Sequence, residues 1–355
     1  NHMGNRFVCF MNCLVFICTA WYLRSIGRAS PPQPIGAIMN TLSKRQFLKL
    51  SLASGVALSL SACGGGDDHD IVDVLSDYPE YSLLVEAVKA AGLVETLKGR
   101  GPFTVFAPNN AAFGDLLTDL GTSAEDLFAN KGLLTAVLTY HVLGSRVPAA
   151  DIPFGSDITT VQKGTFRIAN TAGGAVITDG RGRTSNIKVT NLYASNGVIH
   201  GIDKVILPAN KDITVADVAA LTPGFSILAK ALLEANLVTT LQGEGPFTVF
   251  APTNAAFESL SLSAATVGSV ASLDEILTYH VVPGKVFAAQ VAGLLGDPIS
   301  TVQGETFTIN SVGGRLLITD GQGNSDSEIV ATDVEALNGV IHVISKVIFP
   351  GTGPV

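Results

Sequence analysis

Cysteine and positive charge are scarce in most of this 355-residue chain. The cysteines are Cys9, Cys13, Cys18 and Cys63, so the sequence beyond residue 63 forms no disulfide, offers no thiolate nucleophile and has no cysteine ligands for a metal. Six of the 22 basic residues lie within 1–62, which leaves 16 basic and 30 acidic residues from Cys63 onward and a formal net charge of −14. This acidic balance argues against nucleic-acid binding, which depends on clustered lysine and arginine.

Sequence motifs for catalysis are also missing. No serine lies in a Gly-x-Ser-x-Gly turn, and the glycine-containing stretch 99–102 leads into a predicted strand and not into a phosphate-binding helix. We therefore expect no enzymatic activity and no cofactor.

The chain contains a long internal repeat. The segment GPFTVFAPNNAAF at 101–113 returns as GPFTVFAPTNAAF at 245–257, with a single difference. Four further segments recur in the same order, at 138–142 and 277–281, 160–166 and 301–307, 177–180 and 318–321, and 196–200 and 338–342. The spacing of 139 to 144 residues is far longer than a solenoid repeat. It predicts two complete domains, 70–209 and 210–351, each burying its own core without metal or thiol.

The repeated segment at 101–113 has the pattern of a strand followed by a helix. Phe103 to Phe106 is aromatic and β-branched and predicts a short buried strand, which Pro108 ends. Asn109, or Thr253 in the second copy, then stands where a side chain accepts the free N–H groups of a first helical turn. The one difference between the copies therefore preserves the predicted helix cap.

Further patterns predict helices early and strands late in each copy, which is typical of an α+β domain. Apolar spacing predicts helical stretches at 81–98, 133–138, 225–241 and 273–277. Glycine pairs at 173–174 and 313–314 predict hairpins, and the Asn-Gly pairs at 196–197 and 338–339 predict turns before the last strands.

Four of the six histidines form two equivalent pairs, His141 with His200 and His280 with His342. A stable metal site normally needs three or four ligands. Asp203, the acid close to the first pair, corresponds to a serine in the second copy, and residues three apart on a strand face opposite sides. We therefore interpret the histidines as hydrogen-bonded core residues and expect no metal; metal binding by each pair is the alternative.

The repeated motifs together resemble the fasciclin domain family. The resemblance spans both copies, from about Ile71 to Pro350, and rests on the segments at 101–113 and 196–200, their second copies, and the Tyr-His pairs between them. It implies two tandem domains, each a wedge or sandwich of β-strands packed against α-helices. Members of this family are extracellular or envelope proteins linked to cell adhesion and matrix contact, and are not generally enzymes.

The resemblance also implies candidate binding residues. In animal members the Tyr-His segment and an Asp-Ile pair before Asn-Gly-Val-Ile-His are tied to receptor binding. The matching positions in this chain are Tyr140, His141, Tyr279, His280, Asp333 and Val334, whereas the first copy has Asn191-Leu192 in place of the acidic pair. The alternative is that the Tyr-His pairs are packing and hydrogen-bonding elements, because core-like residues flank them.

The N-terminal region resembles the leader of a bacterial lipoprotein. Residues 39–62 have a basic start and an apolar stretch, and Leu60-Ser61-Ala62-Cys63 resembles a lipobox, in which the cysteine sulfur receives a diacylglyceryl group. Residues 63–69 predict a flexible spacer, and glycine after the cysteine is similar to the signal for outer-membrane sorting. The alternative is a signal anchor or a plain secretory peptide in which the cysteine occurs by accident. We expect residues 1–38 to be an upstream extension of doubtful origin; the alternative is that their apolar run, 7–23, is a real membrane helix.

These observations favour a lipid-anchored envelope protein that acts in adhesion, aggregation or matrix contact. Its expected partner is a cell-surface or matrix protein or a polysaccharide, with the membrane reached through the anchor at Cys63. The alternative is an envelope receptor for a polysaccharide or a small apolar ligand, which a deep apolar cleft between the domains would favour.

Overall fold

A computed structural model describes residues 69–351 of the chain. The predicted leader, Cys63 and most of the spacer lie outside these residues. Within 69–351 no helix is long and apolar enough to cross a lipid bilayer.

The first domain begins with helices and ends with strands. Its α-helices are α3 (Ile71–Ser76), α4 (Ser82–Ala90), α5 (Val94–Lys98), α6 (Asn110–Leu120), α7 (Ala124–Ala129) and α8 (Lys131–Tyr140). Its strands are β1 (Phe103–Pro108), β2 (Val142–Leu143), β3 (Asp157–Thr159), β4 (Thr165–Thr171), β5 (Gly174–Thr178), β6 (Thr184–Ala194) and β7 (Gly197–Ile202). Short 3₁₀ turns stand at η2 (Pro79–Tyr81) and η3 (Ala149–Asp151).

The second domain repeats this order. Its α-helices are α9 (Val215–Ala220), α10 (Ser226–Glu234), α11 (Val238–Leu241), α12 (Asn254–Glu258), α13 (Leu273–Tyr279) and α14 (Ala288–Val291). Its strands are β8 (Phe247–Pro252), β9 (Val281–Pro283), β10 (Pro298–Ser300), β11 (Thr306–Val312), β12 (Arg315–Thr319), β13 (Ser327–Ala336) and β14 (Gly339–Ile344). The 3₁₀ turns are η4 (Asn210–Asp212), η5 (Pro223–Phe225) and η6 (Val267–Ser269), the last standing where the first domain has α7.

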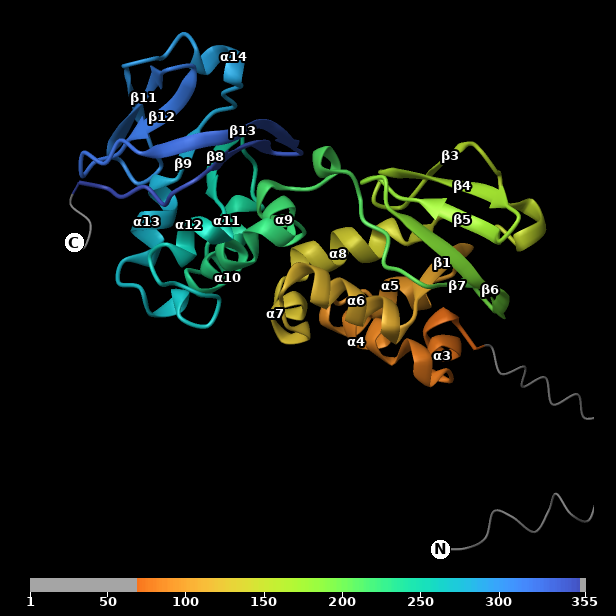
Figure 1. The fold of residues 1–355 in the computed structure, drawn as a ribbon. Helices are drawn as coiled ribbons and strands as arrows, with labels where there is room; N and C mark the ends of the chain where they lie inside the picture. Colours follow the sequence, from red (N-terminus) through yellow and green to blue (C-terminus); the bar gives the residue numbers. More distant parts are fainter. Residues whose placement is uncertain (1–68, 352–355) are drawn as a thin grey trace, which may run out of the picture. The chain divides into compact units, whose positions relative to one another are not determined.

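Each domain builds one seven-stranded sheet with the same topology. The strand orders are β2-β1-β7-β6-β5-β4-β3 and β10-β11-β12-β13-β14-β8-β9, which are the same order read in opposite directions. The first strand of each domain pairs in parallel with the last, and the other pairs are antiparallel. In Figure 1 the helices of the first domain gather beside β1 and β7, while β3, β4 and β5 extend away from them. The predicted α+β class is confirmed.

The predicted cap of the repeated segment is confirmed in both copies. The Asn109 side chain accepts a hydrogen bond from the N–H of Ala112, and the Thr253 hydroxyl accepts one from Ala256. The strands before them end at Pro108 and Pro252. The hairpins predicted from the glycine pairs are also present, as β4–β5 and β11–β12.

The helical stretches predicted at 81–98 and 225–241 are each broken into two helices. The break falls at Gly92, with φ +73°, and at Asn236, with φ +56°. In the first domain the N–H of Leu93, just after Gly92, donates to the carbonyl of Val88. This hydrogen bond is typical of a helix that ends at a residue with left-handed backbone conformation. The apolar spacing continues across the break, so periodicity alone does not reveal it.

Two apolar clusters fill each domain. The smaller cluster lies among the strands and contains an edge-to-face pair of phenylalanine rings. The ring centroids of Phe106 and Phe166 lie 5.2 Å apart in the first domain, and those of Phe250 and Phe307 lie 5.1 Å apart in the second. The larger cluster joins the helices and continues from one domain into the other. The expectation of a separate core in each copy therefore holds for the sheets and not for the helical layer.

Candidate contact surface

The Tyr-His pairs lie inside the domains. Tyr140 and Tyr279 have no exposed surface, and His141 and His280 are almost as deeply buried. The Tyr140 hydroxyl donates to the carbonyl of Thr165 at 2.7 Å and accepts from the N–H of Gly180 at 2.8 Å. Burial raises the pKa of Tyr279 to about 12, so its hydroxyl stays protonated and donates to Thr306. In this fold none of the four side chains is available to touch a partner.

Both ring nitrogens of His141 and of His280 are occupied by backbone groups. Nδ1 of His141 lies 2.7 Å from the carbonyl of Val137, and Nε2 accepts the N–H of Ile206 at 3.1 Å. His280 repeats this geometry. Burial lowers the pKa of each imidazole to about 4, so both rings are neutral at pH 7. This geometry favours the packing interpretation, because no nitrogen is left for a metal or a partner.

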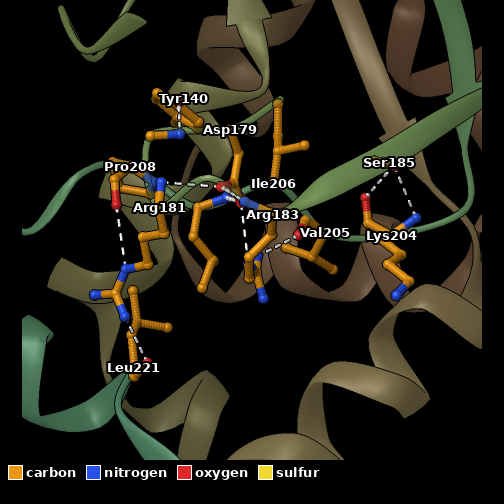
Figure 2. A network of polar contacts seen from close by, with 12 residues as sticks. Tyr140, Asp179, Arg181, Arg183, Ser185, Lys204, Val205, Ile206, Pro208 and Leu221 are labelled. Atoms are coloured by element: carbon orange, nitrogen blue, oxygen red, sulfur yellow. Dashed lines mark hydrogen bonds and ion pairs between the residues drawn. The ribbon is translucent and has the colours of Figure 1, made fainter. Parts of the chain in front are cut away.

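A buried carboxylate close to Tyr140 forms a second network, shown in Figure 2. Asp179 accepts from the backbone N–H groups of Arg181, Arg183 and Leu207 and from the Arg183 side chain, at 2.9 to 3.0 Å. These hydrogen bonds connect the loop after β5 to the segment that follows β7. Asp320 accepts three backbone N–H groups in the same way in the second domain. The repeated segment at 177–180 and 318–321 carries this aspartate in both copies, and the sequence alone indicates no role for it.

Asp333, the acidic candidate, lies on the surface at a bulge in β13. The register between β13 and β14 shifts between Ala331 and Val334, and Asp333 has φ +59°. Its carboxylate accepts the N–H of Ala288 at 2.8 Å, at the start of α14. Asn191, with φ +60°, occupies the same position in the first domain, where its amide oxygen accepts the N–H of Ala149. An amide thus performs the structural role equally well, so the negative charge of Asp333 is additional to it.

The second histidine of each pair supports this bulge. Nε2 of His342 donates to the carbonyl of Val286 at 2.8 Å, and its Nδ1 accepts the N–H of Asp333 at 3.4 Å. His200 makes the same two contacts in the first domain, and burial lowers its pKa. The histidine of the Asn-Gly-Val-Ile-His motif therefore supports the bulge from the interior of the domain, and the motif does not itself form a contact surface.

The bulge segments, defined as residues 188–195 and 330–337, expose different side chains in the two domains. The first exposes Tyr193, at 59%, beside Val189. The second exposes Leu337, at 67%, and Val330, together with Asp333 and Glu335. Position by position, Tyr193 corresponds to Glu335 in the repeat. A shared scaffold thus presents an aromatic surface in one domain and an acidic, aliphatic one in the other.

The structure separates the sequence-derived candidates into two groups. Tyr140, His141, Tyr279 and His280 belong to the interior, and Asp333 belongs to the surface. Val334, its neighbour, is half-buried against the larger apolar cluster. Among residues 69–351 no group of three or more His, Cys, Asp or Glu side chains is arranged to hold a metal ion. The internal repeat did not indicate Tyr193 or Leu337, because the residues at these two positions differ between the copies.

Comparison with known proteins identifies the same repeat. The family model of the fasciclin domain matches residues 79–208 and 223–350. The transforming growth factor-beta-induced protein ig-h3 of Sus scrofa is 30% identical over 259 residues, which cover 72% of this chain and 35% of that protein. The chain thus spans about a third of the length of that relative.

A further relative and a solved structure are also similar to this chain. Protein sll1483 of Synechocystis is 43% identical over 144 residues, which cover 39% of this chain and 74% of that protein. The solved FAS1 domain pair from the insect cell adhesion molecule Fasciclin I covers 74% of this chain at 18% identity, with a TM-score of 0.36, too low to inform the fold. None of these three names describes an enzyme, and the absence of catalysis stays an expectation.

Proposed function

Because the chain belongs to the fasciclin domain family, we propose that it acts in cell adhesion or matrix contact through the exposed bulge segments of its two domains. The observation that carries this proposal is the contrast between a shared scaffold and unlike surfaces. Most of the motif residues that recur in both copies are buried, while the exposed Tyr193 and its counterpart Glu335 differ in chemistry. Conserving the support while varying the exposed side chains is how a binding surface changes partner without losing its fold.

The proposed partner is a cell-surface or matrix protein or a polysaccharide. Tyrosine offers a flat apolar ring with a polar tip, which suits contact with either class. Each surface is small, so two domains on one chain raise the strength of binding by their effective concentration. Anchoring many copies in an outer membrane through a lipid on Cys63 would add to this effect. Mass spectrometry of the native protein tests the anchor, because an unmodified Cys63 would remove it.

The cavities give little support to the alternative of a receptor for a small apolar ligand, and they do not test a receptor for a polysaccharide. The apolar cavity of the first domain lies among α4, α5 and β1 and has a volume of about 40 Å³. Pockets that enclose small molecules usually measure roughly 300 to 1,000 Å³. The larger groove of about 640 Å³ has a mixed lining, in which Asp126, Lys230 and Glu234 lie beside apolar residues such as Leu233 and Val238. It is therefore not the deep apolar cleft that a receptor for an apolar ligand would need.

Binding of the full chain to immobilised matrix proteins and polysaccharides tests the contact surface. Asp333→Asn is a matched variant, because Asn191 already makes the same backbone contact in the first domain. Leu337→Ser likewise installs the residue of the other copy, and Tyr193→Glu does the same for the first bulge. We expect each variant to fold normally and at least one to lose binding severalfold. Unchanged binding by all three, with normal melting curves, would remove the bulge segments from the proposal.

A further inference from the structure

The contact between the two domains contains a buried, uncompensated carboxylate. Asp217 on α9 is 3% exposed, and its side chain accepts from Thr214, which caps the helix, and from the Gln242 amide at 2.8 Å. The same Gln242 nitrogen donates to Asn130 of the first domain at 2.9 Å. Asn130 and Asp217 are thus linked through one amide across the contact.

Apolar side chains surround this network on both sides. Ala216 and Ala220, on either side of Asp217, line a small cavity together with Leu120, Leu127 and Leu133 of the first domain. The face of α9 that carries Asp217 therefore packs against α6, α7 and α8. Asp217 is thus removed from water at this contact, and among residues 69–351 no cationic side chain forms an ion pair with its carboxylate.

The first domain provides an internal comparison for the same position. Asp73 closes the capping box of α3 as Asp217 closes that of α9, and Lys98 stands where the second domain has Gln242. Within residues 69–351, α3 packs on elements of its own domain, and Lys98 binds Asp73 at 3.1 Å in a partly exposed ion pair. This lysine lowers the pKa of Asp73, whereas burial raises the pKa of Asp217. The two carboxylates occupy equivalent positions in the repeat. They differ because Asp217 lies at the contact between the domains and has Gln242 beside it in place of a lysine.

None of the charged side chains on the described elements next to α9 forms an ion pair with the Asp217 carboxylate. Lys230 on α10 binds Asp126 of α7 and Glu234 of α10, both at 2.8 Å. Together with Lys131 these groups line the open groove beside the network. Of the strands that pack on α9, β8 carries no titratable side chain, and β14 carries only His342, which hydrogen-bonds to Val286.

We propose that the contact between the domains is proton-linked, so that protonation of Asp217 strengthens docking of the second domain on the first. A carboxyl group whose pKa is higher in the docked than in the separated state takes up a proton on docking. Docking is then weakest at neutral pH and strengthens as the pH falls towards the ordinary carboxyl range. Each unit by which docking raises the pKa changes the docking constant tenfold. The inference is independent of which partner the bulge segments bind.

Fluorescence energy transfer within the full chain tests the link directly. Dyes at Ala172→Cys and Val312→Cys, in a chain whose native cysteines are serine, report domain separation from exposed positions at the β4–β5 and β11–β12 hairpins. Between pH 7.5 and 5.0, above the usual range of exposed carboxyls, we expect the separated fraction to fall. Urea, at a concentration at which circular dichroism shows both domains folded throughout this pH range, brings that fraction into the measurable range. A constant or rising fraction would overturn the proposal.

Three variants identify the group responsible. Asp217→Asn should abolish the pH dependence and hold the domains docked at pH 7.5, whereas Asp73→Asn should behave as the unchanged protein. Gln242→Lys transplants Lys98 and should reverse the dependence, because a cation beside Asp217 lowers its pKa. Carboxyl NMR titration of the full chain provides the second measurement. A pKa of Asp217 at or below that of Asp73, or loss of the pH dependence in Asp73→Asn, would refute the assignment.

Discussion

Removing the Asp179 carboxylate should destabilise the first domain strongly. The side chain is 1% exposed and accepts three backbone N–H groups as well as the Arg183 guanidinium. Asp179→Ala leaves these donors without their partner in a place that water does not readily reach. The loop after β5 would also lose its attachment to the segment that leads into the second domain.

The expected magnitude follows from these donors. A lost hydrogen bond costs about 1 kcal/mol net, and a buried donor left unpaired costs about 1–3 kcal/mol. At the lower end of that range, the three backbone donors together predict a loss of about 3–4 kcal/mol in the free energy of unfolding. The ion pair adds little, because the Arg183 side chain is 39% exposed. For a domain of this size the loss corresponds to a fall in melting temperature of roughly 6–15 °C.

Urea unfolding of the full chain at pH 7, followed by circular dichroism, measures this loss. The matched control is Arg183→Asn, which installs the residue of the second domain, where the Asn324 amide donates to Asp320 at 3.0 Å. We expect that variant to lose less than about 1 kcal/mol. A loss below 1 kcal/mol in Asp179→Ala, or equal losses in the two variants, would refute the reasoning that the backbone donors dominate.

Three further predictions concern the interior. Because burial lowers the pKa of His141 and of His280 from 6.5 to about 4, the unfolded chain takes up protons first as the pH falls. Urea titrations should show the free energy of unfolding falling by about 2 kcal/mol per histidine from pH 7 to 5 and levelling off below pH 4, and a flat profile would contradict this. Gly101→Ala places a Cβ 2.1 Å from the Asn196 carbonyl at φ +62°, so calorimetry should show a loss above about 1 kcal/mol. Asn196→Ala removes one accepted and two donated hydrogen bonds and should cost about 2–4 kcal/mol in the same assay, whereas a loss under 1 kcal/mol would show that water replaces them.

Local sequence patterns predicted much of the fold because the interactions behind them are local. A cap needs one side-chain acceptor three residues before its N–H donor, and Asn109 and Thr253 both supply it. The hairpins follow from glycine pairs between apolar strands. The internal repeat adds a comparison that a single domain lacks, since every motif appears in a second context. The helix break at Gly92 escaped prediction because the apolar spacing continues through it.

The candidate site depended far more on the tertiary structure. The motif alone left open whether Tyr140 and His141 face a partner or the core, because both arrangements use the same residues. Their burial follows from segments 25 and 65 residues further along the chain, namely β4 and the stretch after β7, whose backbone groups bond to the hydroxyl and the ring nitrogen. Asp333 could be placed at the surface only once the register shift in β13 was known.

The sequence by itself determined that this chain carries two α+β domains of one family, because repeated apolar spacing and caps specify elements through short-range contacts. Only the tertiary structure decided the environment of each charge. Asp73 and Asp217 occupy the same place in the repeat, yet Asp73 lies beside a lysine and is partly exposed, whereas Asp217 is buried where its domain meets the first domain. Burial arises from segments distant in sequence, so equivalent residues acquire opposite shifts in pKa.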